Sequence, residues 1–106
     1  MLMTNFRIIL AYNGTAYHGW QRQNNALAVQ QVLEEAILSL TGQTVTVNGC
    51  SRTDAGVHAL GQVANFKTNS QIPIEKFAIA INTKLKRSIR IIKAEEVDEK
   101  FHSRLS

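Results

Sequence analysis

Residues 43–67 read QTVTVNGCSRTDAGVHALGQVANFK, and two runs with strand character, 43–49 and 57–67, flank a polar turn around Asp54. In the first run, valines alternate with polar residues at the period of a half-buried strand. In the second run, Gly61 is predicted to mark a bulge or a close backbone approach. Because Asp and Gly are both favoured in tight turns, the stretch predicts a β-hairpin with Asp54 near its tip.

Further elements are predicted on both sides of this hairpin. Residues 6–12 (FRIILAY) are apolar except for Arg7, as expected of a strand at a sheet centre or covered on both faces. Residues 28–41 show helical spacing of apolar residues and are followed by Gly42 as a stop. Residues 73–85 predict a second helix and residues 88–94 a last strand. The face of the first helix that we expect to lie in water carries Gln30, Gln31, Glu34 and Glu35.

The order strand, helix, strand, strand, helix, strand predicts an α+β fold of the split βαβ type. In this ferredoxin-like or RRM-like arrangement (βαββαβ), an antiparallel sheet carries two helices on one face. A chain of 106 residues with 44% apolar residues has the size of one domain, residues 1–106. The other sheet face would be free. RNA-recognition modules bind bases there, but the fold serves many functions and does not by itself indicate one.

Composition narrows the class of protein. A net charge of +4 is a weak indication of a polyanionic partner. The single cysteine, Cys50, excludes an internal disulfide, and no apolar run approaches the roughly 20 residues that span a bilayer. The N-terminus does not resemble a signal peptide. We therefore expect a soluble cytoplasmic protein without a membrane partner.

The candidate chemistry reduces to one carboxylate. Cysteine and histidines are scattered without the spacing of zinc ligands, and no carboxylate cluster suits Mg²⁺ or Ca²⁺, so no metal site is predicted. A nucleophilic Cys50 with His58 as its base is conceivable across the hairpin, although a lone cysteine beside a glycine is more often a small buried residue. Outside helix surfaces and an acidic segment near the end, Asp54 stands alone. Any chemistry is therefore expected to depend on Asp54.

Two further segments permit two interpretations each. In residues 13–25, Tyr17 and Trp20 share a loop with amides and one arginine, which suits stacking on nucleotides. The alternative is that both rings fold back over one end of the core. A run of cations without acids is more commonly a solvated rim, with phosphate contact as the second interpretation. This run comprises Lys84, Lys86, Arg87, Arg90 and Lys93.

Four segments, in order and spacing, resemble the TruA-type tRNA pseudouridine synthases. Residues 51–59 with 61–66 are similar to the aspartate motif of that family, and the length of this motif makes the match specific. Residues 12–23 resemble the family's N-terminal loop. Two shorter matches are residues 29–34, similar to its first helix, and 101–104, similar to the segment that leads into its second half. The chain departs from the family pattern at Asn13, Ser51, Lys86 and Leu105.

The resemblance implies isomerisation of uridine to pseudouridine in the anticodon stem-loop of tRNA, without cofactor or metal. Asp54 is then the catalytic carboxylate beside C1′ of a flipped-out uridine, where it attacks the sugar, stabilises positive charge or removes a sugar proton. In an extended chain, Arg52 lies on the same side as Asp54. Arg52 then either contacts RNA or forms a structural ion pair with Asp54. Further RNA contacts are assigned to Tyr17, Trp20, Arg22, His58, Phe101, His102, Ser103, Arg104 and Leu105.

The resemblance also implies a missing part. Family enzymes continue with a second, similar half that supplies a tyrosine for the target base and basic residues for the cleft. We therefore expect this chain to be the aspartate-bearing N-terminal half of a homodimeric enzyme, able to fold but isomerising little by itself.

Two other interpretations stay open. A non-catalytic RNA-binding module of RRM-like fold should carry exposed aromatics at alternate positions of its third strand, where Phe66 is the only aromatic. A small-ligand or regulatory domain of the same fold predicts no tRNA affinity at modest salt.

Overall fold

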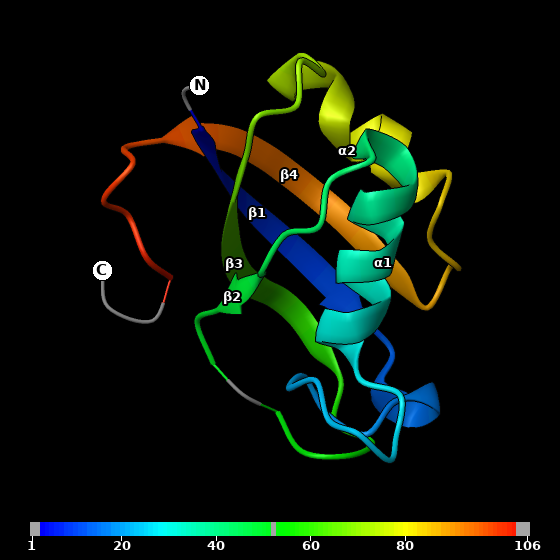
Figure 1. The fold of residues 1–106 in the computed structure, drawn as a ribbon. Helices are drawn as coiled ribbons and strands as arrows, with labels where there is room; N and C mark the ends of the chain where they lie inside the picture. Colours follow the sequence, from blue (N-terminus) through cyan, green and yellow to red (C-terminus); the bar gives the residue numbers. More distant parts are fainter. Residues whose placement is uncertain (1–2, 52, 104–106) are drawn as a thin grey trace.

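The structure, a computed structural model, describes residues 3–51 and 53–103. Within them, four strands form one antiparallel sheet in the order β2-β3-β1-β4, with both helices on one face (Figure 1). This confirms the predicted split βαβ arrangement. The elements are β1 (Thr4–Tyr12), a short 3-10 helix η1 (Gly14–Ala16), α1 (Val29–Thr41), β2 (Asn48–Gly49), β3 (Ala59–Thr68), α2 (Ile74–Asn82) and β4 (Ile89–Val97).

Strand β1 lies at the centre of the sheet, between β3 and β4, as its apolar sequence predicts. Every second residue of its first part, from Phe6 to Leu10, is buried in the core under the helices. The Phe6 ring packs edge-on against Phe66 of β3 and Phe77 of α2, with centroids 5.6 and 5.4 Å apart. These three rings join the sheet to the helix layer.

Helix boundaries follow local chemistry. Helix α1 ends at Gly42, whose φ of 75° lies in the left-handed region that glycine adopts without strain. The Gly42 N–H donates to the carbonyl of Leu38 at 2.8 Å and closes the last turn. Helix α2 begins after Pro73, as predicted.

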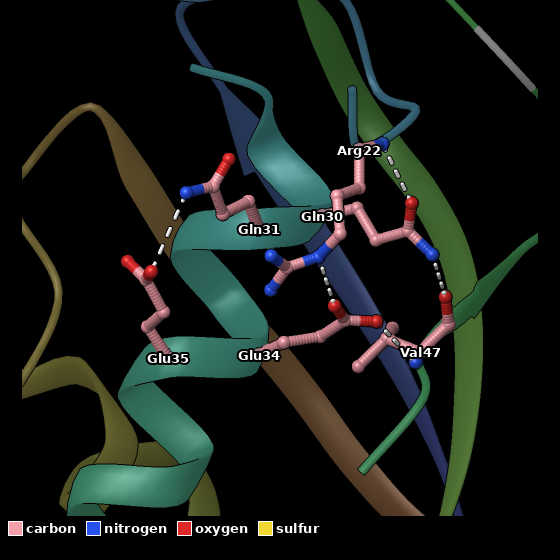
Figure 2. A network of polar contacts seen from close by, with 6 residues as sticks. All are labelled: Arg22, Gln30, Gln31, Glu34, Glu35 and Val47. Atoms are coloured by element: carbon pink, nitrogen blue, oxygen red, sulfur yellow. Dashed lines mark hydrogen bonds and ion pairs between the residues drawn. The ribbon is translucent and has the colours of Figure 1, made fainter. Parts of the chain in front are cut away.

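Strand β2 is shorter than predicted. Only Asn48 and Gly49 pair with β3, whereas the sequence predicts a strand over residues 43–49. The reason lies at Val47, whose backbone bonds to side chains of α1 (Figure 2). Its N–H donates to Oε2 of Glu34 at 2.9 Å, and its carbonyl accepts from Nε2 of Gln30 at 2.8 Å. Since helix side chains take both groups, this residue cannot join the sheet ladder.

The predicted water-facing side of α1 is therefore only partly right. Gln30 is 8% exposed and the side chain of Glu34 is 11% exposed. Both side chains also bond to Arg22 (Figure 2). The Arg22 backbone N–H donates to Gln30 Oε1 at 2.7 Å, and its side-chain Nε donates to Glu34 Oε1 at 2.9 Å. Gln31 and Glu35 contact each other on the solvent side of the helix. Positions 30 and 34 lie one turn apart on the side that meets residues 43–47.

Replacing Glu34 with alanine is expected to destabilise the fold by about 1–3 kcal/mol, because the Val47 N–H loses its acceptor away from water. The matched control is Glu35→Ala, one residue further along α1 and exposed. It should change the free energy of unfolding by no more than about 0.5 kcal/mol. Urea denaturation monitored by circular dichroism measures both variants, and equal effects would contradict the assignment.

A bulge interrupts β3 shortly after the strand begins. The connection from β2 to β3, residues 50–58, is called the Asp54 loop below. Leu10 pairs with Gln62 and Tyr12 with Ala59, so Leu60 and Gly61 together stand opposite one residue of β1. The bulge predicted from Gly61 is confirmed. It changes the direction of β3 next to the loop that carries Asp54.

Candidate active site

Asp54 lies in the connection between β2 and β3, as the hairpin prediction requires. It is exposed, and its carboxylate has no hydrogen bond or ion pair with any other residue that the structure describes. Its own carbonyl accepts from the Val57 N–H at 3.2 Å, and Gly56 within this turn has a φ of +79°. Among the described residues, only its own backbone fixes the position of this carboxylate, which is accessible to a ligand.

The loop that follows β1, residues 13–20, is hydrogen-bonded to the Asp54 loop. Three hydrogen bonds connect the two loops on both sides of Asp54. They are Trp20 N–H to Thr53 carbonyl at 3.1 Å, Gly56 N–H to Tyr17 carbonyl at 3.1 Å, and Gly14 N–H to His58 Nδ1 at 2.8 Å. Backbone donors and acceptors of one loop are therefore satisfied by the other, and the two form one unit.

Two strand side chains anchor the same unit to the sheet. The hydroxyl of Tyr12, a buried residue of β1, lies 2.7 Å from Thr53 Oγ1. On the other side, Nε2 of the buried Gln62 donates to the Ser51 carbonyl at 2.5 Å. Asp54 is therefore carried by a loop that is bonded to the rigid sheet both before and after residue 52, as positioned catalysis requires.

Glycines allow the two loops to approach this closely. A Cβ on Gly14 would lie 1.9 Å from the carbonyl oxygen of Val57, which is far inside van der Waals contact. Gly19 has a φ of +80°, and a Cβ there would lie 2.4 Å from the Thr53 carbonyl oxygen. Any side chain at either position would push the Asp54 loop away.

Tyr17 and Trp20 are core residues, only 4% and 2% exposed. The Trp20 ring covers Gly49, where a Cβ would come within 2.6 Å of it, and its centroid lies 6.4 Å from that of Tyr12. Neither ring leaves a face for a base to stack on, so the predicted RNA contacts of Tyr17 and Trp20 are wrong. The alternative, that they fold back over one end of the core, is confirmed.

A family model described as tRNA pseudouridine synthase matches residues 8–105. The chain belongs to the tRNA pseudouridine synthase family. The match spans both loops of the site and nearly the whole fold, which confirms the resemblance seen in the sequence.

Individual relatives agree with the family match. The chain is 53% identical over 104 residues to a tRNA pseudouridine synthase A of Thermoanaerobacter sp. (strain X514), covering 98% of this chain and 43% of the relative. It is 55% identical over 102 residues to that of Acetivibrio thermocellus, covering 96% and 42%. It is 56% identical over 104 residues to that of Clostridium botulinum (strain Alaska E43 / Type E3), covering 98% and 43%. The chain therefore spans less than half the length of these relatives.

Of the other predicted site residues, His58 lies at the end of the Asp54 loop, and Arg22 lies in the segment before α1, bonded to Glu34 of that helix. His58 is exposed, and because its Nδ1 accepts from Gly14, the neutral ring carries its proton on Nε2. Arg22 is also exposed but its Nε is bonded to Glu34. Cys50 and His58 line one hollow, of about 330 Å³, yet no hydrogen bond joins them in the described part of the chain. The structure gives the Cys50–His58 pair no support.

Phe101, His102 and Ser103 lie elsewhere. Asn5 and Asn65 bind this segment to the sheet, each donating its Nδ2 to the Phe101 carbonyl, at 2.9 and 3.3 Å. Asn5 stands near the start of β1, whereas His102 also lines a hollow of about 220 Å³ together with Trp20 and Gly49. Phe101 and His102 line a separate hollow of about 890 Å³.

Ser103 is only 3% exposed, and its N–H donates to Asn65 Oδ1 at 2.9 Å. Its predicted RNA contact is therefore corrected, because almost none of its surface is accessible. Arg52, Arg104 and Leu105 lie outside the described residues, and so does the predicted neighbourhood of Arg52 and Asp54.

The residues that support the site carry no clear functional pattern in the sequence. Tyr12, Thr53, Gly14 and Gln62 hold the Asp54 loop, but none was singled out as functional. Tyr12 sits in a strand where an aromatic residue fits the core pattern, and Gln62 fits the pattern of an ordinary polar strand residue. One signal was available in the sequence. Tyr12 is the last residue of a buried strand, and the hydroxyl of a buried tyrosine needs a hydrogen-bond partner.

Two general features complete the description. Among residues 3–51 and 53–103, no group of three or more His, Cys, Asp or Glu side chains is arranged to hold a metal ion. Neither helix in these ranges has the length and apolar character needed to cross a membrane.

Proposed function

We propose that this chain supplies the aspartate-bearing part of an enzyme that isomerises uridine to pseudouridine in the anticodon stem-loop of tRNA, with Asp54 as the catalytic carboxylate. The observation that carries the proposal is the exposed Asp54, without a partner among residues 3–51 and 53–103, on a loop bonded to the sheet and to residues 13–20. Membership of the tRNA pseudouridine synthase family supports the reaction. No cofactor is invoked, and the full enzyme is proposed to be a cytoplasmic homodimer.

The reaction rearranges one nucleoside. The bond from N1 to C1′ breaks, uracil turns, C5 bonds to C1′, the hydrogen on C5 leaves as a proton and N1 gains one. The target must leave the helix stack, at a cost of roughly a few kcal/mol. A positioned carboxylate beside C1′ can attack the sugar, stabilise its developing positive charge or remove a sugar proton, and Asp54 is available for each role.

Asp54 needs an opposite wall. The relatives are more than twice as long as this chain, which covers 42–43% of them, and we propose that their remaining portion closes the cleft and contacts the base. His58 and Arg22, both exposed, are proposed to contact RNA on this side, together with Arg52, Arg104 and Leu105. Phe101 and His102 are proposed to contact RNA as well. Alone, the chain should isomerise little.

A binding module without catalysis is the weaker candidate. An RRM-like domain stacks bases on aromatic residues of its free sheet face. Phe66, the only aromatic residue of β3, is instead fully buried under the helices. A small-ligand or regulatory domain would bind no tRNA at modest salt, and this outcome would remove the proposal.

The direct test is a tritium-release assay. The completed protein, defined as this chain continued by the remaining portion of the Thermoanaerobacter relative, is incubated with tRNA labelled at C5 of uridine. We expect tritium release and pseudouridine in the anticodon stem-loop. The isolated chain, at excess over tRNA in a single turnover, should release little. Absence of pseudouridine with a folded completed protein would overturn the proposed function.

Replacing Tyr12 with phenylalanine is expected to slow isomerisation roughly tenfold in the completed protein, because Thr53 loses its anchor and Asp54 shifts. The matched control is Tyr17→Phe. Both tyrosines are 4% exposed and both hydroxyls bond to another hydroxyl, but that of Tyr17 bonds to Ser88 at 2.5 Å.

Each variant should lose about 0.5–1.5 kcal/mol of stability, while only Tyr12→Phe reduces the single-turnover rate. Thr53→Ser, which keeps a hydroxyl at residue 53, should retain activity. Equal rates for the two tyrosine variants would show that the Tyr12 bond serves stability alone.

A further inference from the structure

A second hollow lies next to the Asp54 loop. It occupies about 420 Å³ where β1 ends and where β3 and β4 begin. Tyr12 pairs with Ala59 on one side and Ile89 on the other, and the Asn13 N–H donates to the Ser88 carbonyl at 2.8 Å. The ends of three strands therefore form its floor, which makes the hollow a property of the rigid sheet.

Cations line this hollow without any acid. Arg87 is exposed and has no ion pair within the described ranges, while Arg90 is half-buried. The Arg90 guanidinium donates to the carbonyls of Asn82 and Leu85, at 2.7 and 3.3 Å, so its charge is fixed but not neutralised. His58 adds an Nε2–H donor. Fixed positive charge with free donors is suited to a phosphate group.

An apolar surface adjoins these donors. Leu60 is 89% exposed because the bulge in β3 turns it out of the ladder, and it stands opposite Ala11. Ala11 follows the core residue Leu10 and therefore points to the sheet face away from the helices. An exposed leucine alone carries little meaning, but beside unneutralised arginines it offers a surface for a sugar or base.

The hollow shares two lining residues with another hollow beside the Asp54 loop. His58 and Ala59 line it and also line the hollow of about 330 Å³ that Thr53 borders. Tyr12, which forms part of its wall, bonds to Thr53. The two hollows therefore adjoin at His58 and Ala59, between the Asp54 loop and the residues Arg87 and Leu60.

We propose that this hollow binds a backbone phosphate of the RNA strand next to the target uridine, with Arg87 as the main donor and Leu60 under the adjoining nucleoside. The identity of the ligand as RNA rests on the proposed function. The proposal concerns affinity and register of the RNA, whereas the proposed function concerns chemistry at Asp54.

The test measures the Kd for an anticodon stem-loop RNA across a series of salt concentrations, by fluorescence anisotropy. It uses the 106-residue chain carrying Asp54→Asn, so that no turnover intervenes. Arg87→Gln should raise Kd roughly threefold to tenfold at low salt and reduce the slope of log Kd against log salt by about one. Leu60→Asn should raise Kd without changing that slope.

The matched control is Lys76→Gln, which removes the same charge from an exposed residue of α2 that does not line the hollow. It should leave Kd and slope nearly unchanged. If Arg87→Gln behaves like Lys76→Gln at every salt concentration, or if the chain binds no RNA at low salt, the proposal is overturned. Salt-dependent binding through Arg87, combined with no pseudouridine formation by the completed protein that keeps Asp54, would instead remove the proposed function alone.

Discussion

Replacing Asp54 with asparagine is expected to abolish release of the C5 hydrogen of uridine in tRNA by the completed protein. The rate should fall by roughly 10⁴-fold or more, the scale of losing a group that acts directly on the reacting atoms. Asparagine keeps the size and the backbone preferences of the turn but removes the negative charge, which attack, charge stabilisation and proton removal all need. The tritium-release assay under single-turnover conditions measures the change.

Folding should survive this substitution, because the Asp54 carboxylate is exposed and has no partner among the described residues. The free energy of unfolding, measured by urea denaturation, should change by no more than about 0.5 kcal/mol. Glu75→Gln, which removes an exposed carboxylate from the first turn of α2, serves as the control for charge and should retain the full rate. Turnover retained by the Asp54 variant would remove Asp54 from the mechanism.

Replacing Gly14 with alanine is expected to have the second largest effect. The added Cβ would lie 1.9 Å from the Val57 carbonyl oxygen, which is backbone and cannot rotate away. The two loops must separate, which costs roughly 1–3 kcal/mol or more and breaks the Gly14 to His58 bond. A displacement of about 1 Å at Asp54 should lower the single-turnover rate roughly 100-fold.

Gly42→Ala distinguishes displacement from general loss of stability. Gly42 has a φ of +75° at the end of α1, and nothing lies within 4 Å of its added Cβ. Alanine there should cost roughly 1–2 kcal/mol through backbone strain alone. Its rate should equal that of the unmodified protein. A Gly14→Ala protein as active as Gly42→Ala would contradict the role of the residue 13–20 loop in positioning Asp54.

Local patterns predicted those parts of the fold that depend on near neighbours in sequence. The helical spacing of residues 28–41, the stop at Gly42 and the bulge at Gly61 all follow from backbone preference and periodicity. The predicted strand over 43–49 failed because its competitor, the side chains of Gln30 and Glu34, lies on another element. Alternation of valines indicates burial on one side but does not identify what covers it.

For the candidate site, the sequence by itself determined which residue we propose as the catalytic one. Asp54 was the single carboxylate in a long, specific motif at a turn, and turn chemistry depends on adjacent residues. Only the tertiary structure decided that Tyr17 and Trp20 belong to the core and that Tyr12 anchors Thr53. An aromatic residue suits a core and a nucleotide platform equally well, since both offer an apolar surface. Which surface it meets depends on packing between segments far apart in the chain.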